Sequence, residues 1–166
     1  ISPRIIPGTI WGKTSLADSD EHDEHGNITE SAEVRVSMMK KRMEKMTLLE
    51  SELEEPNYLG ADKPDILFLG WGSTQGPIEE AIGQLVGEGL SVGSLCFGDI
   101  WPLPKKILLE KAEYASKVIN IEQNYTGQLA KLIRQETGIA FDESILKYDG
   151  RQMSLDYILE EIRKVI

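Results

Sequence analysis

The stretch Ile66-Leu67-Phe68-Leu69-Gly70, followed at once by Trp71-Gly72-Ser73-Thr74-Gln75-Gly76-Pro77, decides the fold class of this chain. The first five residues form a continuous apolar run that is too short for a helix and is typical of a strand buried on both faces. The residues after it form a turn that ends in a capping hydroxyl and a proline suited to a first helical turn. A strand, a turn and a helix in this order indicate an α/β domain.

The same alternation continues to the end of the chain. Apolar runs and stripes predict further strands over 90–97, 117–122 and 145–148, and helices over 78–86, 107–112, 129–137 and 154–166. Strands that alternate with helices at this spacing predict a mainly parallel sheet of about four or five strands with helices on both faces. We therefore expect a three-layer α/β domain over 64–166.

The residues before this domain follow a different pattern. Residues 29–55 carry apolar side chains every three or four positions, which predicts one long amphipathic helix with Thr29 as its cap. Residues 1–28 contain prolines, glycines and a polar run without an apolar side chain, so we expect an irregular arm. The chain starts at Ile1 without a recognisable leader, and we interpret this start as a cut end.

Composition excludes several classes of partner. The chain has 166 residues, 28 of them acidic and 18 basic, and its net charge of −10 disfavours nucleic acid and anionic membranes. No apolar stretch is long enough to predict a membrane span. The single cysteine, Cys96, excludes an internal disulfide framework, suits a cytoplasmic location and is too few for an iron–sulfur cluster.

The most informative segment is 122–128, where a predicted parallel strand ends and a helix begins. Open α/β sheets place their ligands at this edge. A helix cap accounts for Asn124 or Thr126 but not for the whole set, so we predict that the segment serves an interface or the approach to an active site. The residues of this candidate site are Glu122, Asn124, Tyr125, Thr126, Gly127 and Gln128.

A second candidate of the same kind is the polar run His22, Asp23, Glu24 and His25. Two imidazoles and several carboxylates can hold a divalent metal, but a structural site usually draws its ligands from two chain segments. We assign no metal ligands and favour an acidic loop that faces solvent or a partner.

Neither of two other motifs yields a catalytic or cofactor-binding residue. The glycines at 70–76 can approach an anion, yet they match neither G-x-G-x-x-G nor the lysine-containing phosphate loop. Cys96 has no base near it in the sequence and lies at the end of an apolar strand, so we predict a buried structural thiol.

The chain resembles a known family in segments spread over nearly its whole length. Three of them are Ser2-Pro3-Arg4-Ile5-Ile6-Pro7-Gly8, Glu21-His22-Asp23-Glu24-His25-Gly26-Asn27-Ile28-Thr29-Glu30 and Met39-Lys40-Lys41-Arg42-Met43-Glu44-Lys45. Two more are Ile121-Glu122-Gln123-Asn124-Tyr125-Thr126-Gly127-Gln128-Leu129 and Lys147-Tyr148-Asp149-Gly150-Arg151. In these segments it is similar to the α subunit of 2-oxoacid:ferredoxin oxidoreductases, which include pyruvate and 2-oxoglutarate enzymes. The middle of the chain resembles, more loosely, the C-terminal domain of transketolase-like enzymes.

The resemblance implies a part of an enzyme. The family carries out coenzyme A-dependent oxidative decarboxylation of a 2-oxoacid with thiamine diphosphate, magnesium and a [4Fe–4S] cluster, and ferredoxin accepts the electrons. The family's Gly-Asp-Gly and Tyr-Pro-Ile-Thr-Pro motifs are missing, so the resemblance implies a C-terminal fragment without cofactors of its own. Its partners would be the remaining α-subunit domains, a β subunit that carries thiamine diphosphate and the cluster, and ferredoxin for the complex.

This interpretation predicts a structural and assembly domain that is inactive alone, and two alternatives stay open beside it. One is a free-standing flavodoxin-like module that binds a small anion or a nucleotide at the turn after the first strand. The other is a metal-dependent hydrolase that uses His22 and His25.

Overall fold

The computed structural model describes residues 6, 8 and 20–166. Most of the predicted irregular arm, including residues 2–5 and 7 of the motif at 2–8, therefore lies outside the described residues. The chain forms two compact units, Ile1–Glu52 and Leu53–Ile166. Among the described residues, no helix combines the length and the apolar character needed to cross a bilayer.

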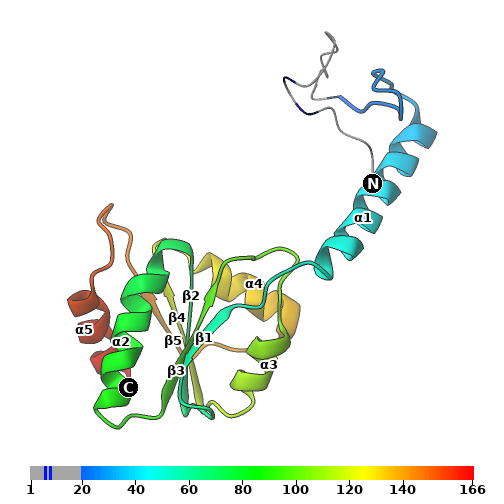
Figure 1. Ribbon diagram of the computed structural model, residues 1–166. Helices are drawn as coiled ribbons and strands as arrows, with labels where there is room; N and C mark the ends of the chain where they lie inside the picture. Colours follow the sequence, from blue (N-terminus) through cyan, green and yellow to red (C-terminus); the bar gives the residue numbers. More distant parts are fainter. Residues whose placement is uncertain (1–5, 7, 9–19) are drawn as a thin grey trace. The chain divides into compact units, whose positions relative to one another are not determined.

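The second unit is built on a five-stranded sheet, as the apolar runs predict (Figure 1). Its strand order is β1-β3-β2-β4-β5, and every pair is parallel except β1 with β3. The expectation of a mainly parallel α/β sheet is therefore confirmed. The strands are β1 Asn57–Gly60, β2 Ile66–Trp71, β3 Val92–Phe97, β4 Lys117–Glu122 and β5 Glu143–Leu146.

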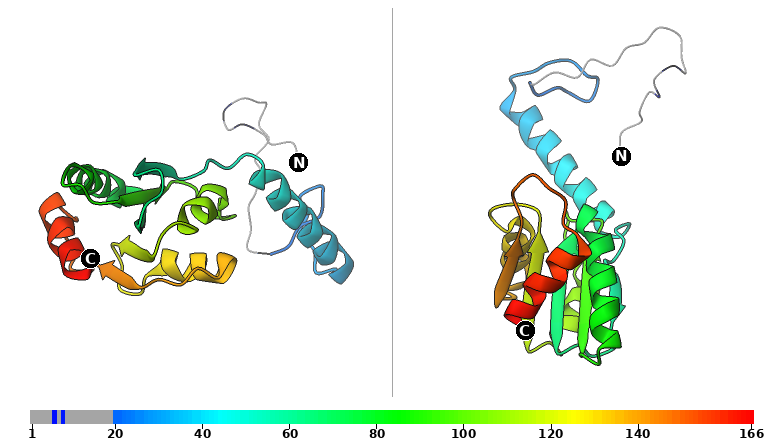
Figure 2. Two further views of the ribbon diagram at one scale, coloured as in Figure 1. Left: turned by 90° about the horizontal axis from the view of Figure 1, so that it is seen from below. Right: turned by 90° about the vertical axis from the view of Figure 1, so that its left-hand side faces the viewer.

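Helices cover both faces of this sheet, which gives the expected three layers (Figure 2). Alternate side chains of β2 enter two separate cores: Phe68 packs on one face, and Leu67 and Leu69 pack on the other. Buried residues of α2 and α5 join the core of Phe68, and those of α3 and α4 join the other. These helices are α2 Gln75–Gly87, α3 Lys106–Ala112, α4 Gln128–Thr137 and α5 Leu155–Val165, and a short 3₁₀ turn, η1 Gly72–Thr74, precedes α2.

Strand β1 lies before residue 64, in a stretch where the sequence analysis predicts no strand. It is an antiparallel edge strand, with Tyr58 opposite Leu95 and Gly60 opposite Gly93. Three of its four residues are exposed, so it has too few apolar side chains to produce a recognisable strand pattern. Its close approach to β3 depends on glycine, because a Cβ at Gly93 would collide with the ring of Tyr58.

Two other strand boundaries differ from the prediction. Strand β3 begins at Val92 rather than at residue 90, and β5 covers 143–146 rather than 145–148. Lys147 has already left the ladder, although its backbone N–H still donates to the carbonyl of Glu122. The chain therefore turns away from the sheet at its carboxyl edge with Lys147 and Tyr148 on the loop.

The first unit contains the long helix α1, Ala32–Glu50, which is shorter at both ends than the predicted 29–55. Its cap is Ser31, whose hydroxyl accepts the N–H of Val34, and the assignment of the cap to Thr29 is wrong. Thr29 belongs instead to the preceding loop, since its backbone N–H donates to the carbonyl of Glu21. None of the side chains of α1 is buried.

Candidate functional site

The carboxyl ends of β2 and β4 lie next to each other in the sheet, and the chain leaves them in opposite directions (Figure 1). After β2 it enters α2 on one face, and after β4 it enters α4 on the other. Such a divergence opens a crevice outside the strand ends, where open α/β sheets bind ligands. The segment 122–128 lies at this edge, as its position after a strand predicts.

Glu122 ends β4 and is completely buried. Its carboxylate accepts the backbone N–H groups of Leu129 and Ala130, both at 3.0 Å, and so caps the first turn of α4. Three side-chain donors complete its environment: the amides of Asn120 and Asn124 and the indole of Trp71. Glu122 is therefore a structural acceptor inside the fold, and it is not exposed to a partner or a substrate.

Asn124 also folds its side chain inward. Its Nδ2 donates to Glu122 at 2.7 Å, and its Oδ1 accepts the backbone N–H groups of Thr126, Gly127 and Gln128. Gly127 has φ = 62°, a left-handed conformation that glycine adopts without the cost of a Cβ. Glu122, Asn124 and Gly127 together build the turn into α4, so capping accounts for more of this set than the sequence analysis expected.

The exposed members of the segment are Tyr125, Thr126 and Gln128. Tyr125 is 70% exposed, and its ring meets that of Tyr148 edge to face, with centroids 4.8 Å apart. Tyr148 is itself 63% exposed. This aromatic pair joins the loop after β4 to the loop after β5 on the outside of the unit.

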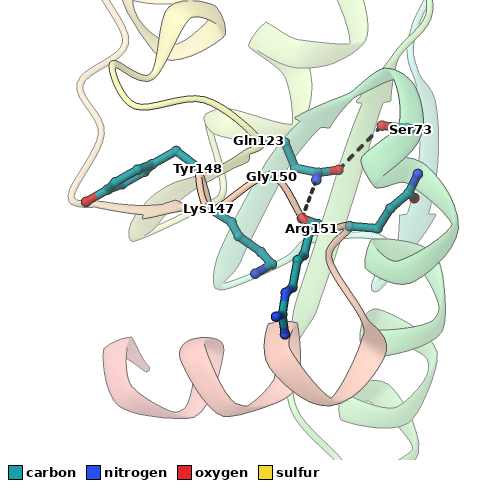
Figure 3. A pocket seen from close by; sticks show the side chains of 7 residues that line it. Ser73, Gln123, Lys147, Tyr148, Gly150 and Arg151 are labelled. Carbon is teal, nitrogen blue, oxygen red and sulfur yellow. Dashed lines mark hydrogen bonds between the residues drawn. The ribbon is translucent and has the colours of Figure 1, made fainter.

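A pocket of about 460 Å³ opens beside this pair at the same edge of the sheet (Figure 3). The side chain of Gln123 crosses it: Nε2 donates to the carbonyl of Arg151 at 3.1 Å, and Oε1 accepts the hydroxyl of Ser73 at 3.5 Å. The lining comes from the ends of β2, β4 and β5. It consists of Ser73, Gln123, Lys147, Tyr148, Gly150, Arg151 and Gln152.

Sequence reasoning did not assign these pocket residues to a site. Lys147, Tyr148, Gly150 and Arg151 stood out only as part of a family-like segment, and Gln123 was absent from the candidates. One signal could have found them, because the predicted strand 145–148 is parallel to 117–122. Parallel neighbours end at the same edge, so a strand-end lysine followed by a Gly-Arg turn had to lie near residues 122–128.

The other candidate site belongs to the first unit, and there the described residues form a tight loop. His22 and Ile28 pair as an isolated antiparallel bridge, and the carboxylate of Asp23 accepts the backbone N–H groups of His25 and Asn27. Asp23 is therefore occupied within the loop. Glu24 and His25 are exposed, with Oε1 and Nε2 3.6 Å apart.

Glu21 fastens this loop to α1. Its carboxylate pairs with Arg35 at 2.7 Å and with Arg42 at 2.5 Å, and its side chain is 8% exposed. The two guanidinium groups, that of Arg42 above all, lower the pKa of Glu21 from 4.5 to about 2. Sequence reasoning treated the neighbouring residues 22–25 as the candidate and gave no role to Glu21.

Neither a reactive thiol nor a metal centre emerges from the described residues. Cys96 lies in β3 and is 2% exposed. Burial raises the pKa of its thiol to about 12, with a smaller contribution from the charge of Glu79. In the described part of the chain, no three His, Cys, Asp or Glu side chains come together as metal ligands do. The imidazoles at 22 and 25 thus have no such cluster around them.

Comparison with known proteins shows what this architecture is similar to. Residues 64–158 match the family model described as pyruvate:ferredoxin oxidoreductase core domain II. The α subunit of 2-oxoacid:ferredoxin oxidoreductase 1 from Aeropyrum pernix is 35% identical over 160 residues, which covers 93% of this chain and 25% of that protein. The corresponding α subunit from Saccharolobus solfataricus is 33% identical over 150 residues, with coverages of 89% and 24%.

Among solved structures, the chain is similar to 2-oxoglutarate:ferredoxin oxidoreductase from Magnetococcus marinus, which has 2-oxoglutarate, coenzyme A and succinyl-CoA bound. The TM-score is 0.79 at 29% identity, over 99% of this chain and 28% of that one. The chain spans about a quarter of the length of the curated relatives described above.

Proposed function

Because this chain belongs to the family of 2-oxoacid:ferredoxin oxidoreductase α subunits, we propose that it works as a structural and assembly domain of such a subunit. In this role it holds neighbouring domains and chains in place and carries out no chemistry alone. We further propose the order of parts that the sequence indicates, with an arm over 1–28, then a helical segment and then the α/β domain, which strand β1 extends to Asn57, ahead of the predicted start at residue 64.

The observation that carries this proposal is the exposed apolar face of α1. Val36 and Met43 lie two turns apart on one side of the helix and are 56% and 55% exposed, although both are apolar. Met39 lies between them, and the three residues line one shallow hollow. Since burial of such side chains is favourable, a helix with this face gains stability when another surface covers it.

The occupant we propose for this face is the remainder of the α subunit. The matches to the Aeropyrum and Saccharolobus relatives cover 93% and 89% of this chain, within polypeptides about four times as long. A methionine-rich surface suits this use, because unbranched thioether side chains adapt to an irregular neighbour. The exposed residues of the candidate sites, among them His25, Tyr125 and Gln128, would face the same neighbours or the approach to the active site.

For the whole enzyme we propose coenzyme A-dependent oxidative decarboxylation of a 2-oxoacid with ferredoxin as electron acceptor. The described residues do not fit the cofactors that this reaction uses. They hold no cluster of potential metal ligands for the magnesium of thiamine diphosphate, and the chain's single cysteine is buried in the core, whereas a [4Fe–4S] centre takes four thiolates.

We therefore place thiamine diphosphate, magnesium and the cluster outside this domain, in other domains of the α subunit and in a β subunit. A cytoplasmic location suits such an assembly and agrees with a buried, reduced cysteine. Nothing in the described residues selects among pyruvate, 2-oxoglutarate and branched-chain 2-oxoacids, so the choice of substrate belongs to those other parts.

The test is made in the complete α subunit, coexpressed with its β subunit. Val36→Ser with Met43→Ser removes apolar area from the exposed face of α1 without adding charge. We expect less assembled complex by size exclusion and native mass spectrometry, and 2-oxoacid-dependent dye reduction that falls in proportion. Lys45→Ser is the matched control, since Lys45 is exposed on the opposite side of the same helix and its replacement should change neither quantity.

Unchanged complex mass and unchanged rate in the Val36/Met43 double variant would reject the assembly role. A second assay addresses the prediction that the domain is inactive alone. The isolated 166-residue chain is mixed with a 2-oxoacid, coenzyme A, thiamine diphosphate, magnesium and a redox dye, without added subunits. Turnover in that mixture would show that the chain carries out chemistry by itself.

A further inference from the structure

The pocket of Figure 3 lies where the topology of the sheet favours a ligand. Ser73 follows β2 and Gln123 follows β4, and their hydrogen bond spans the point where α2 and α4 diverge to opposite faces. Its volume of about 460 Å³ falls within the range of small-molecule sites, roughly 300–1,000 Å³. A single inorganic ion would fill only a part of it.

The charge at this pocket is opposite to that of the chain as a whole. Lys147 and Arg151 both line it, and Figure 3 shows their side chains extending in the same direction while Tyr148 points away from them. Among the described residues, the carboxylate that pairs with these cations is that of Asp149, so their local sum of charge is positive in a chain with a net charge of −10. A positive site on an acidic protein attracts anions, whereas the rest of the acidic surface repels them.

Local contacts hold the ammonium group of Lys147 and the backbone of Arg151 in position. Asp149 accepts Nζ of Lys147 at 2.5 Å through Oδ2 and the backbone N–H of Arg151 at 3.0 Å through Oδ1. Gly150 between them has φ = 78°, which permits this narrow turn. Nζ of Lys147 also lies 4.9 Å from the ring centre of Tyr157, and the lysine side chain is only 12% exposed.

Two helices begin next to the same pocket. Helix α2 starts at Gln75, shortly after the lining residue Ser73, and α5 starts at Leu155, shortly after the lining residue Gln152. The amino end of a helix carries partial positive charge and favours a multiply charged anion. The guanidinium of Arg151 can bind two oxygens of a phosphate at once, and the hydroxyl and amide groups of the lining add neutral donors.

We propose that this pocket binds a small molecule that carries a phosphate or diphosphate group, held by Arg151 and Lys147 at the carboxyl ends of β2, β4 and β5. The site lies entirely within the α/β domain and does not depend on the assembly role proposed above. It differs from a phosphate site at the glycine turn 70–76, because its cations come from the loop after β5.

Titration of the full 166-residue chain with inorganic diphosphate tests the proposal, by isothermal calorimetry and by ¹⁵N–¹H NMR. We expect saturable binding, with the largest amide shifts at Ser73, Gln123 and Arg151. Arg151→Gln should weaken binding about tenfold or more, the usual effect of losing a charge-assisted hydrogen bond. Arg134→Gln is the control, since it removes the same charge from the exposed last turn of α4 at the other end of that helix.

Further arms define the ligand chemistry. Phosphate, diphosphate and ADP all carry the proposed phosphate group. Tighter binding of ADP than of diphosphate would support the proposal and show that the pocket also contacts the nucleoside. Succinate, a dicarboxylate, should bind at least about tenfold more weakly than diphosphate. Thermal unfolding without ligand establishes that each variant is folded, and Ser73→Ala is a second, milder change in the pocket.

Three results would overturn the proposal. The first is no saturable binding of diphosphate by the chain. The second is equal weakening by Arg151→Gln and Arg134→Gln, or equal binding of succinate, which would indicate unspecific attraction of anions. The third is a set of shifted amides that excludes the pocket residues.

Discussion

The indole N–H of Trp71 donates a hydrogen bond of 3.3 Å to Oε2 of Glu122. Trp71 ends β2 and Glu122 ends β4, so this contact joins two neighbouring parallel strands at the edge where the chain leaves them. The same Oε2 also accepts the backbone N–H of Leu129 in the first turn of α4. One buried carboxylate thereby fixes the position of a helix relative to two strand ends.

Replacement of Glu122 should be among the most destabilising single changes in the α/β domain. Glu122→Ala leaves five buried or half-buried donors without an acceptor, and we expect a loss of about 3–5 kcal/mol in the free energy of unfolding. Glu122→Gln keeps the shape but turns an N–H₂ toward some of those donors, and should cost about 2 kcal/mol. Urea unfolding followed by circular dichroism measures both.

The control is Glu143→Ala, which removes an exposed carboxylate from β5. Its effect should stay within about 0.5 kcal/mol, as is usual for surface positions. A Glu122→Ala variant as stable as this control would contradict the role assigned to Glu122.

The loop at 20–29 should detach from α1 in acid. Arg42 and Arg35 lower the pKa of Glu21 to about 2, below its ordinary value of 4.5. A lowered carboxyl pKa stabilises the docked loop fully above pH 4.5, and this stabilisation is lost as the pH falls from 4.5 through 2. Amide hydrogen exchange or NMR shifts of residues 21–29 across this range would follow the change.

Arg42→Gln removes the largest cause of the lowered pKa. In that variant the transition of the loop should move upward, toward pH 4.5. A transition at the same pH in both proteins would mean that the pair with Arg42 does not hold the loop.

The thiol of Cys96 should be unreactive in the folded protein. Burial raises its pKa to about 12, so almost none of the thiolate that reacts with disulfide reagents exists at pH 8. We expect modification by a chromogenic disulfide at least about a hundredfold slower than that of a cysteine placed at exposed Ser51 in a Cys96→Ala background. Equal rates for the two cysteines would show that the strand opens readily.

Ser94 should tolerate loss of its hydroxyl. Its Oγ is buried and has no hydrogen-bond partner among the described residues. Ser94→Ala should leave the free energy of unfolding unchanged or raise it by about 1 kcal/mol, because an unsatisfied buried group is removed. Thermal and urea unfolding provide the measurement.

Ser91→Ala is the matched control, since the hydroxyl of Ser91 donates to the carbonyl of Lys63 and accepts the N–H of Asp65. It should lower the free energy of unfolding by about 1 kcal/mol. A greater loss in the free energy of unfolding for Ser94→Ala than for Ser91→Ala would indicate that the hydroxyl of Ser94 has a hydrogen-bond partner in solution.

The sequence predicts the buried layers of this fold well, because a run such as 66–70 has no alternative to a central strand. It predicts the edges poorly. Strand β1 is recognised only through its pairing with β3, which no local pattern encodes. Thr29 and Ser31 are both suitable caps by residue type. In the structure, the backbone N–H of Thr29 donates to the carbonyl of Glu21, and Ser31 caps the helix.

For the candidate site, too, the sequence predicts one part well and another part poorly. The position of 122–128 at the sheet edge follows from the order of strands and helices. Sequence alone does not reveal that Glu122 and Asn124 turn inward, because the same polar residues cap a helix or face a ligand. The cations of the pocket lie after a different strand, and only the parallel register of β4 and β5 brings them to Gln123.

Because Glu122 caps α4, the residues that hold this edge of the sheet together differ from those that an incoming molecule meets. The first amides of α4 are already engaged, so an incoming molecule meets the loop at 147–152 rather than that helix end. A substitution in this loop can therefore change what the edge recognises without removing the hydrogen bonds that keep the strands and α4 together.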